Sequence, residues 1–397
     1  MGISRRNFFR QITVGAAVTA TPWHLEKLLQ VASQDRSSPH QSGEPIRLDM
    51  NINPYGPSPK VVEVIRANLN SVNRYPDSDY RPLAERIADF HNIKPNEVTL
   101  GCGSCEVLHM AAAAFLTRNK TLLLASPTFE PVANLAKRVR AQVIPVPLNK
   151  YYAHDLDAML HHTDVSTGMI YICNPNNPTG SLTPRKDLES FLEKLPAKLP
   201  VVIDEAYHEY VGPSSDYASF IDHPIDDNRM IVVRTFSKIY GLAGLRLGYA
   251  VSSKEVSLKL SSTQLERGIN IVAARAAAAA LDDSDYVHHS FRRNNDDRQE
   301  FYNRTNGRML GQVDSHTNFV FMNTGLPSSQ VVEHFERNNI VLGPVVPEMN
   351  KHVRVAISTE ENMKEFWRVW NLQPRHSHKM ATTRDPAPQN PEECVSL

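Results

Sequence analysis

The segment Thr235–Tyr249 contains the residues of this chain whose types and spacing most clearly suggest chemistry. It reads T-F-S-K-I-Y-G-L-A-G-L-R-L-G-Y, and Lys238 stands just after a short apolar strand. A lysine can form a Schiff base with a carbonyl compound when burial or a cationic neighbour keeps part of its amine neutral. Ser237 and Arg246 are groups that bind phosphate. The segment could therefore hold pyridoxal phosphate, which carries both an aldehyde and a phosphate. The alternative is a solvated loop lysine beside an arginine that binds no phosphate.

Two further segments end expected strands with polar groups. Asp204 closes the apolar strand Val201–Ile203, and a buried carboxylate must be paired or neutral. Facing a pyridine nitrogen, it would keep that nitrogen protonated; a helix cap is the alternative. Tyr207 follows three residues later, and Asn177 lies in the N-P-N-N-P-T-G turn after the strand Met169–Cys173. These two side chains could bind a phenolic oxygen, although such a turn can also form without a ligand.

Other candidate residues are individually weaker. Ser104 and Cys105 stand at the start of an expected helix, where backbone amides and the helix dipole bind phosphate. Phe129 and Tyr75 are loop aromatics, and Phe129 could stack on a planar cofactor, although an isolated aromatic is more often part of a core. Arg354 lies in an apolar strand and therefore needs a carboxylate partner, either from a substrate or from the protein itself.

Short apolar strands alternate with helices through the middle of the chain, which predicts an α/β fold. The strands are expected at 97–100, 121–125, 142–145, 169–173, 200–203, 230–234 and 247–251. This order is typical of a mostly parallel sheet with helices on both faces. An alanine-rich helix at 267–281 and a charged helix at 285–306 lead to a smaller α+β domain. Its strands are expected at 318–322, 340–342 and 352–356, with a helix at 328–338.

This pattern divides the chain into five parts. They are a signal and flexible arm (1–34), an N-terminal segment joining the small domain (35–74), a large domain (75–281), a small C-terminal domain (282–372) and a tail (373–397). The tail has no apolar periodicity, so we expect it to be disordered.

Composition favours a small, discrete ligand. The chain has 397 residues, of which 41% are hydrophobic, and Lys+Arg equal Asp+Glu at 43 each, so no net charge attracts nucleic acid or an anionic membrane. Cys102 and Cys105 form a C-x-x-C without a second pair or a nearby histidine cluster, so we expect no metal site. The pair could form a disulfide in an oxidising compartment, but two free thiols are the favoured interpretation.

The N-terminus resembles a twin-arginine export signal. Residues 4–10 read S-R-R-N-F-F-R and precede a modestly apolar stretch at 11–20 that ends in small residues. That stretch is too short for a permanent membrane anchor. The pattern predicts export to the periplasm, with cleavage after Ala20 as one possible outcome. A basic N-terminal helix on a cytoplasmic protein is the alternative.

The separate signals occur in an order that resembles a known family. Asn177, Asp204, Tyr207, Lys238 and Arg246 follow one another as in the fold-type I pyridoxal-phosphate aminotransferases, and most closely as in the histidinol-phosphate aminotransferase family. The resemblance covers roughly residues 48–371. It implies the fold-type I architecture, a large domain with a mostly parallel seven-stranded sheet beside a smaller α+β domain, and a homodimer.

The resemblance also implies a role for each matching residue. Lys238 would form the Schiff base and move the proton between the substrate Cα and the cofactor, and Asp204 would hold the pyridine nitrogen. Asn177 and Tyr207 would contact the phenolic oxygen, and Phe129 would stack on the ring. The phosphate would be held by Ser104, Cys105, Ser237 and Arg246 of the same subunit, together with Tyr75 of the partner subunit. Arg354 would bind the substrate carboxylate, and Tyr55 would line the mouth of the pocket.

One departure from the family bears on the substrate. Family members that act on histidinol phosphate carry an arginine after the small-domain strand, where this chain has Gly343. Losing a bidentate partner weakens phosphate recognition, although Lys351, His352 or Arg267 could compensate. We therefore expect a transaminase of amino-acid metabolism acting on a non-phosphorylated amino acid and a 2-oxo acid.

Three alternatives are kept beside this expectation. The first is a histidinol-phosphate transaminase proper, and the second is a pyridoxal-phosphate decarboxylase or racemase on the same fold. The third is a non-catalytic amino-acid sensor, which the presence of Lys238 and Asp204 disfavours.

Overall fold

The computed structural model describes residues 43–222 and 227–373. The chain divides into two compact units, Met1–Pro45 and Ile46–Leu397. The predicted export signal, the flexible arm up to residue 42 and the tail beyond residue 373 lie outside the described residues. Within those residues, no helix is long and apolar enough to span a membrane.

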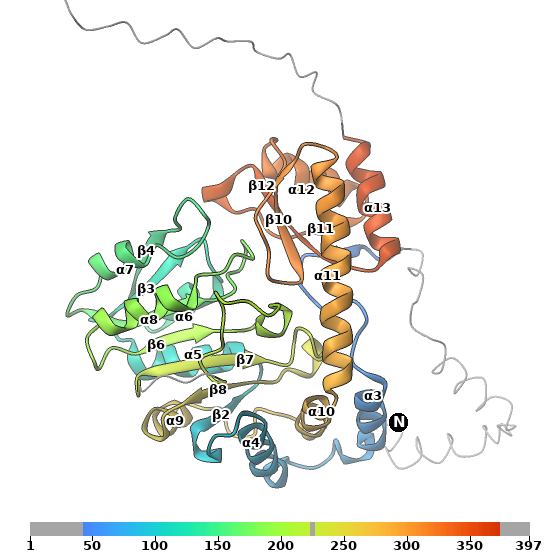
Figure 1. Ribbon diagram of the computed structural model, residues 1–397. Coiled ribbons are helices and arrows are strands. Elements are labelled where there is room, and N and C mark those ends of the chain that lie inside the picture. The colour runs from blue at the N-terminus through green and yellow to red at the C-terminus, as the bar shows by residue number, and fades with distance from the viewer. Residues whose placement is uncertain (1–42, 223–226, 374–397) are drawn as a thin grey trace, which may run out of the picture. The chain divides into compact units, whose positions relative to one another are not determined.

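A seven-stranded sheet forms the centre of the second unit (Figure 1). In spatial order its strands are β2 (Val98–Gly101), β8 (Gly248–Ser252), β7 (Met230–Thr235), β6 (Val201–Asp204), β5 (Thr167–Cys173), β3 (Thr121–Ser126) and β4 (Gln142–Pro147). The five strands from β7 to β4 are parallel, and β8 runs antiparallel to both of its neighbours. The predicted α/β class with a mostly parallel sheet is confirmed.

Helices cover both faces of the sheet because successive strand residues point to opposite sides. On β6, Val202 belongs to one buried cluster while Val201 and Ile203 belong to the other. The first cluster is completed by α5 (Ser104–Phe115), α6 (Pro131–Arg138) and α9 (Lys254–Ser261). The second is completed by α3 (Pro59–Ala67), α4 (Asp77–His91), α7 (Leu156–His161), α8 (Arg185–Lys194) and α10 (Ile271–Leu281). The mostly apolar sequences of the inner strands follow from this burial on both faces.

Two small sheets are separate from the central sheet. β10 (Phe319–Asn323) pairs antiparallel with β9 (Gly311–Gln312) and β12 (His352–Ala356), and β1 (Ile46–Leu48) pairs parallel with β11 (Ile340–Leu342). The helices of this part are α11 (Ser284–Asn306), α12 (Ser328–Arg337) and α13 (Glu360–Asn371). Their core contains the neighbouring rings of Phe301, Phe335, Phe366 and Trp367. In Figure 1, α11 extends from beside α10 to the small sheets.

Several element boundaries differ from the sequence prediction. The helix expected to begin at residue 267 instead begins at Ile271. Arg267 has a left-handed φ of 55°, which is not helical. The Asn270 side chain caps the helix by accepting a hydrogen bond from the Ala273 amide at 2.8 Å. α7, α9 and α13 were not predicted. Short 3₁₀ turns add η1 (Leu69–Ser71), η2 (Pro95–Glu97), η3 (His208–Tyr210), η4 (Ala243–Leu245) and η5 (Pro347–Met349).

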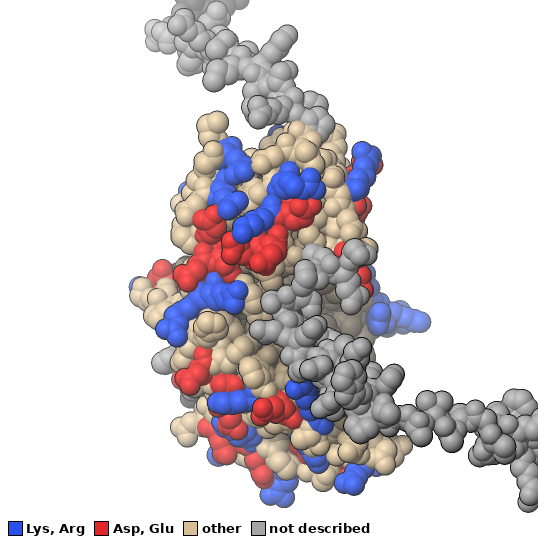
Figure 2. All heavy atoms as spheres, turned by 90° about the vertical axis from the view of Figure 1, so that its right-hand side faces the viewer, with Lys and Arg blue, Asp and Glu red and all other residues tan. Residues whose placement is uncertain are grey.

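Basic and acidic side chains are interspersed over the face that Figure 2 shows. This mixture agrees with the equal numbers of Lys+Arg and Asp+Glu in the sequence. The chemically informative residues instead lie at the carboxyl ends of β5, β6 and β7, which meet at one edge of the parallel sheet. The residues at these ends are Asn174, Asp204–Glu205 and Phe236–Lys238, respectively. Ligands of open α/β sheets bind at this edge.

Candidate active site

Lys238 lies on the loop that follows β7 and reaches toward the N-terminal segment. Its Nζ donates hydrogen bonds to the carbonyl oxygens of Met50 at 3.3 Å and Asn51 at 3.1 Å. Burial, assisted by the positive charge of Arg354, lowers the pKa of the Lys238 amine to about 8, although Asp204 acts in the opposite direction. A substantial part of this amine is therefore neutral near physiological pH, as a nucleophilic lysine requires.

Asp204 ends β6 with only 3% of its surface exposed. Its Oδ2 accepts a hydrogen bond from the Tyr171 hydroxyl at 2.8 Å, and its Oδ1 accepts from the Ala206 amide at 3.1 Å. Burial nevertheless raises the pKa of this carboxyl to about 6. A cationic group placed against Asp204 would stabilise the carboxylate, so the residue suits a protonated ring nitrogen.

Arg354 and Asn177 meet across the boundary between the central sheet and β12. The Arg354 guanidinium donates to Asn177 Oδ1 at 2.5 Å and to the Asp49 carbonyl oxygen at 2.6 Å. Its Nε is buried without a hydrogen-bond partner in the part of the chain that the structure describes. Both recorded partners are neutral oxygens, so the guanidinium retains its capacity for an anion. A substrate carboxylate fits this guanidinium.

Tyr207 lies beside Lys238. Its hydroxyl accepts a hydrogen bond from Asn51 Nδ2 at 3.0 Å, and the Lys238 Nζ lies 5.4 Å from its ring centroid. Burial raises the pKa of the Tyr207 hydroxyl well above its ordinary value, so the group stays protonated and can donate. Because Asn177 Oδ1 is engaged by Arg354, the amide nitrogen of Asn177 is the donor that a phenolic oxygen would need.

The start of α5 and Arg246 form a cradle that we name the glycine cradle: Gly103, Ser104, Cys105, Ser237 and Arg246. Gly103 has a φ of 74°, and a Cβ atom there would collide with the Arg246 guanidinium. Arg246 donates to the Ser237 hydroxyl at 3.4 Å and to the Ala243 carbonyl oxygen at 3.0 Å. Helix amides, hydroxyls and a guanidinium thus converge on one small volume, which is the donor set that a phosphate requires.

The remaining predicted residues lie apart from this constellation. Phe129 is half-buried and packs against the cluster that α5 and α6 share with the sheet. Tyr75 is 73% exposed, with the Arg267 guanidinium 4.8 Å from its ring centroid. Tyr55 donates to Asp297 Oδ2 at 3.1 Å, and Arg293 stacks on its ring. The expected roles of these three aromatics stay predictions.

The structure adds residues that sequence reasoning missed. Tyr171 supports Asp204 directly, and its hydroxyl within an otherwise apolar strand was a visible signal. Glu106 accepts from the amides of Cys102 and of Leu265, the latter at 2.9 Å, and so ties the glycine cradle to the segment before α10. Cys102 and Cys105 are free thiols, as favoured from the sequence. Within residues 43–222 and 227–373, no group of three or more His, Cys, Asp or Glu could hold a metal ion.

Comparison with known proteins identifies one family. The model of the family "Aminotransferase class I and II" matches residues 44–369. A histidinol-phosphate aminotransferase of Caldicellulosiruptor saccharolyticus is 34% identical over 81% of this chain and 89% of the relative. One from Staphylococcus carnosus is 37% identical over 71% and 78%. The crystal structure of a histidinol-phosphate aminotransferase from Sinorhizobium meliloti in complex with pyridoxal-5'-phosphate matches with a TM-score of 0.76, at 25% identity over 81% of this chain and 89% of that chain.

Gly248 provides a first test of the glycine cradle. A Cβ at this position would collide with the Ser104 amide nitrogen and lie 2.9 Å from both the Arg234 carbonyl oxygen and the Gly103 carbonyl carbon. We expect Gly248→Ala to weaken pyridoxal phosphate binding about ten-fold or more and to lower the free energy of unfolding by about 1–3 kcal/mol. Absorption titration and denaturant unfolding measure the two effects. Gly244→Ala is the matched control, because a Cβ there meets nothing within 4 Å; equal behaviour of the two variants would contradict the prediction.

The depressed pKa of Lys238 predicts a distinctive pH dependence. Below pH 8 the amine is protonated and unreactive, so its acetylation rate in the cofactor-free protein should fall about ten-fold per pH unit. Above pH 8 the rate should level off, whereas a solvated lysine would keep gaining reactivity up to its ordinary pKa of 10.5. Brief labelling with acetic anhydride between pH 6 and 11, followed by peptide mass spectrometry, measures the midpoint. A midpoint near 10.5 would contradict the burial argument.

Proposed function

Because its match spans nearly the whole described chain, this protein belongs to the class I and II aminotransferases, and we propose that it transfers an amino group through Lys238. The enzyme is a pyridoxal-phosphate-dependent transaminase. The observation that supports the role of Lys238 most directly is its half-buried, partly neutral amine, which shares its surroundings with Asp204 and Arg354. Transaminases of this family act on an amino acid and a 2-oxo acid.

The residues present fit the cofactor. A phosphate suits the glycine cradle, where the absent Cβ of Gly103 leaves room for Arg246. Asp204 suits the ring nitrogen because a cation there would relieve the cost of its burial. When bound, pyridoxal phosphate supplies an aldehyde that combines with amines and a ring that withdraws electrons from the adjacent carbon.

The protein's own groups then have separate tasks. Lys238 Nζ, with a pKa of about 8, can both take and return a proton at neutral pH. Tyr207 stays protonated and presents its hydroxyl as a donor, held by Asn51. Arg354 orients the substrate through its anionic group, which fixes the position of the reacting carbon relative to Lys238. A 2-oxo acid binds the same guanidinium in the return half of the reaction.

For the amino donor, histidinol phosphate is the candidate that the relatives support best. The curated relatives cited above are named histidinol-phosphate aminotransferases at 34% and 37% identity. Those names favour the alternative over our first expectation of a non-phosphorylated amino acid. In this proposal a phosphate monoester takes the place of a carboxylate against Arg354, since both are anions that a guanidinium binds through paired hydrogen bonds.

One local observation favours a non-phosphorylated donor as the second candidate. Gly343 follows β11 and stands beside Arg354, so that a Cβ at 343 would lie 2.9 Å from both Cβ and Nε of Arg354. The arginine that the histidinol-phosphate family places here is therefore replaced by the backbone of a glycine. A dianionic phosphate would have one bidentate partner fewer, whereas a monoanionic carboxylate needs only Arg354.

A donor comparison distinguishes the two candidates. The purified holoenzyme is supplied with 2-oxoglutarate and with either histidinol phosphate, histidinol or a panel of the common L-amino acids, and glutamate formation is measured. If histidinol phosphate is the donor, its kcat/KM should exceed that of histidinol by about 100-fold or more, since the phosphate contributes a charge-assisted contact. Preference for a non-phosphorylated amino acid would instead support the second candidate. If none of these donors yields glutamate, the proposed transamination is contradicted.

Gly343→Ala shows whether Arg354 binds the substrate's anionic group. The added Cβ should push the guanidinium out of place, raising the KM of the 2-oxo acid about ten-fold while pyridoxal phosphate stays bound. Gly311→Ala is the matched control in the same part of the fold, because its Cβ would make only an ordinary contact of 3.5 Å with Asn323. An unchanged KM in Gly343→Ala would argue against the assigned role of Arg354.

The homodimer is part of the same proposal. Tyr75 and Val72 lie just before α4, and 73% and 67% of their respective surfaces are exposed. Tyr75 is predicted to reach the phosphate of the partner subunit, which would account for its exposure in a single chain. Light scattering of the purified protein should give about twice the 44.6 kDa of one chain. A monomer that retains full activity would rule out a shared site.

A further inference from the structure

A buried charge network lies directly behind the active-site ends of β6 and β7. We name it the Arg234 network: Arg234, Glu205, Glu209 and Ser219. Arg234 Nε donates to Glu205 Oε2 at 2.9 Å, its NH1 to Glu209 Oε1 at 3.2 Å, and its NH2 to the Ser219 hydroxyl at 2.8 Å. Arg234, Glu205 and Ser219 are each no more than 2% exposed. All three donor nitrogens of the guanidinium are therefore engaged away from solvent.

Glu205 is held from several sides at once. Its Oε2 also accepts from the Ser219 hydroxyl at 2.8 Å, and its Oε1 accepts from the Phe220 amide at 2.9 Å. Its own amide donates to the Val233 carbonyl oxygen at 2.9 Å, which continues the pairing of β6 with β7 by one residue. The side chain and backbone of Glu205 thus both attach the end of β6 to β7.

The segment 204–210 presents two different sides. Asp204 and Tyr207 contact Tyr171 and Asn51 within the candidate active site. Glu205 and Glu209, on the same segment, contact Arg234 instead. On β7, Arg234 stands four residues before Lys238. One guanidinium therefore connects the segment that carries Asp204 and Tyr207 to the strand that leads to Lys238.

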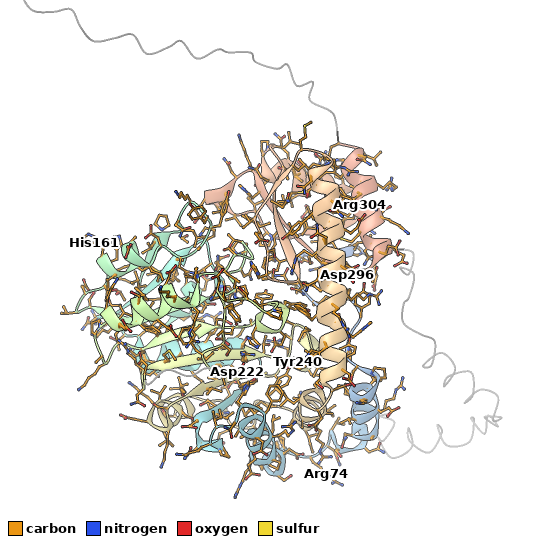
Figure 3. All side chains as sticks on the ribbon, viewed as in Figure 1. Arg74, His161, Asp222, Tyr240, Asp296 and Arg304 are labelled. Carbon is orange, nitrogen blue, oxygen red and sulfur yellow. The ribbon has the colours of Figure 1, made fainter. Side chains whose placement is uncertain are left out.

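The outer edge of the network faces a cavity of about 740 Å³. Asp222 and Tyr240, which Figure 3 labels, both line this cavity. Asp222 Oδ2 lies 3.6 Å from Arg234 Nη2. His91 and His208 also contact Asp222. Burial lowers the pKa of the Arg234 guanidinium, but Glu205 and Glu209 outweigh that effect and raise it, so the arginine stays charged.

Stability alone is a weak reason for such an arrangement. Desolvating buried charges largely cancels their attraction, and apolar side chains of similar volume often replace buried ion pairs without loss of stability. A guanidinium that donates to a different partner from each of its three nitrogens does supply a directional connection that apolar packing lacks. Reacting groups must be held within a fraction of an ångström, and a supporting layer of hydrogen bonds provides that accuracy.

We propose that Arg234 and Glu205 are positioning residues that keep Asp204, Tyr207 and Lys238 in the relative arrangement needed to act on one cofactor. The proposal deepens the assigned transamination and rests on the role of Lys238 given above. Neither residue touches the reacting atoms. Each acts by connecting the end of β6 to β7 from the face of the sheet opposite α5.

The test compares Arg234→Lys and Glu205→Gln with the wild-type holoenzyme. Lysine keeps the charge, but its single nitrogen cannot reproduce the planar fork of three nitrogens that Arg234 presents to three separate partners. Glutamine keeps the shape of Glu205 but loses the ion pair. We expect kcat to fall about 30-fold while the KM of the 2-oxo acid changes less than about three-fold, since Arg354 is untouched. The acetylation midpoint of Lys238 in the cofactor-free protein should move by about 0.5 pH unit or more.

Arg229→Lys is the matched control at the other end of β7. Arg229 is also a largely buried arginine, with NH1 donating to the Pro196 carbonyl oxygen at 2.7 Å and NH2 donating to the Leu192 carbonyl oxygen at 2.7 Å. We expect this variant to unfold more easily while kcat and the Lys238 midpoint stay at wild-type values. If Arg234→Lys behaves in the same way, the network is only structural and the proposal is overturned.

Two further measurements keep the outcome decisive. If Arg234→Lys does not fold, Glu209→Gln neutralises one of the three partners of the guanidinium and should give a smaller shift of the same Lys238 midpoint. An unshifted midpoint there would overturn the proposal. The labelling experiment needs no cofactor or substrate, so it separates failure of the positioning role from failure of the proposed transamination, which the donor comparison detects.

Discussion

The site depends on keeping a half-buried lysine amine and a buried carboxylate in the same neighbourhood without a proton passing from one to the other. Burial and Arg354 lower the pKa of Lys238 to about 8, while burial raises the pKa of Asp204 to about 6. Between these values both groups are close enough to titration to respond to a ligand. A solvated lysine and aspartate would be fully charged over the whole range, and the lysine would be a poor nucleophile. The parallel sheet produces this situation because its strand ends place both groups at one buried edge.

The arrangement is maintained by contacts between parts of the chain that lie far apart in sequence. Lys238 donates to Met50 and Asn51, and Asn177 meets Arg354, over separations of more than 170 residues. These contacts join the central sheet to the segment after β1 and to β12. A change in the packing of the small sheets would therefore be felt at the reacting amine, which gives the smaller part of the fold a direct role in the chemistry.

The sequence was sufficient to predict the strands of the central sheet because all of them except the partly exposed edge strand β4 are mostly apolar runs that are buried on both faces. It also pointed to Asn177, Asp204, Tyr207 and Lys238, which end adjacent parallel strands or lie in the loops after them, and to Arg246, which precedes the antiparallel strand β8. The roles assigned to these residues stay predictions. Helix α13 was missed although Thr359 caps it and its apolar spacing is regular, so attention to capping would have found it. The contacts of Tyr171 with Asp204 and of Arg234 with Glu205 could not be predicted. Both depend on which face of a strand a side chain occupies and on which strand lies next to it, and neither is a local property.

Donor choice is a different kind of problem, because it depends on space rather than on residue type. Position 343 and Arg354 compete for the same volume: even one carbon added to Gly343 would press on the arginine side chain. An arginine at 343 could not simply be added to this site, since β11 and β12 would first have to move apart. The main chains there are joined by a hydrogen bond from the Gly343 amide to the Arg354 carbonyl oxygen at 3.0 Å. The glycine and the placement of Arg354 are thus one structural choice, and the contact proposed between Arg354 and a substrate anion would be made by a single guanidinium.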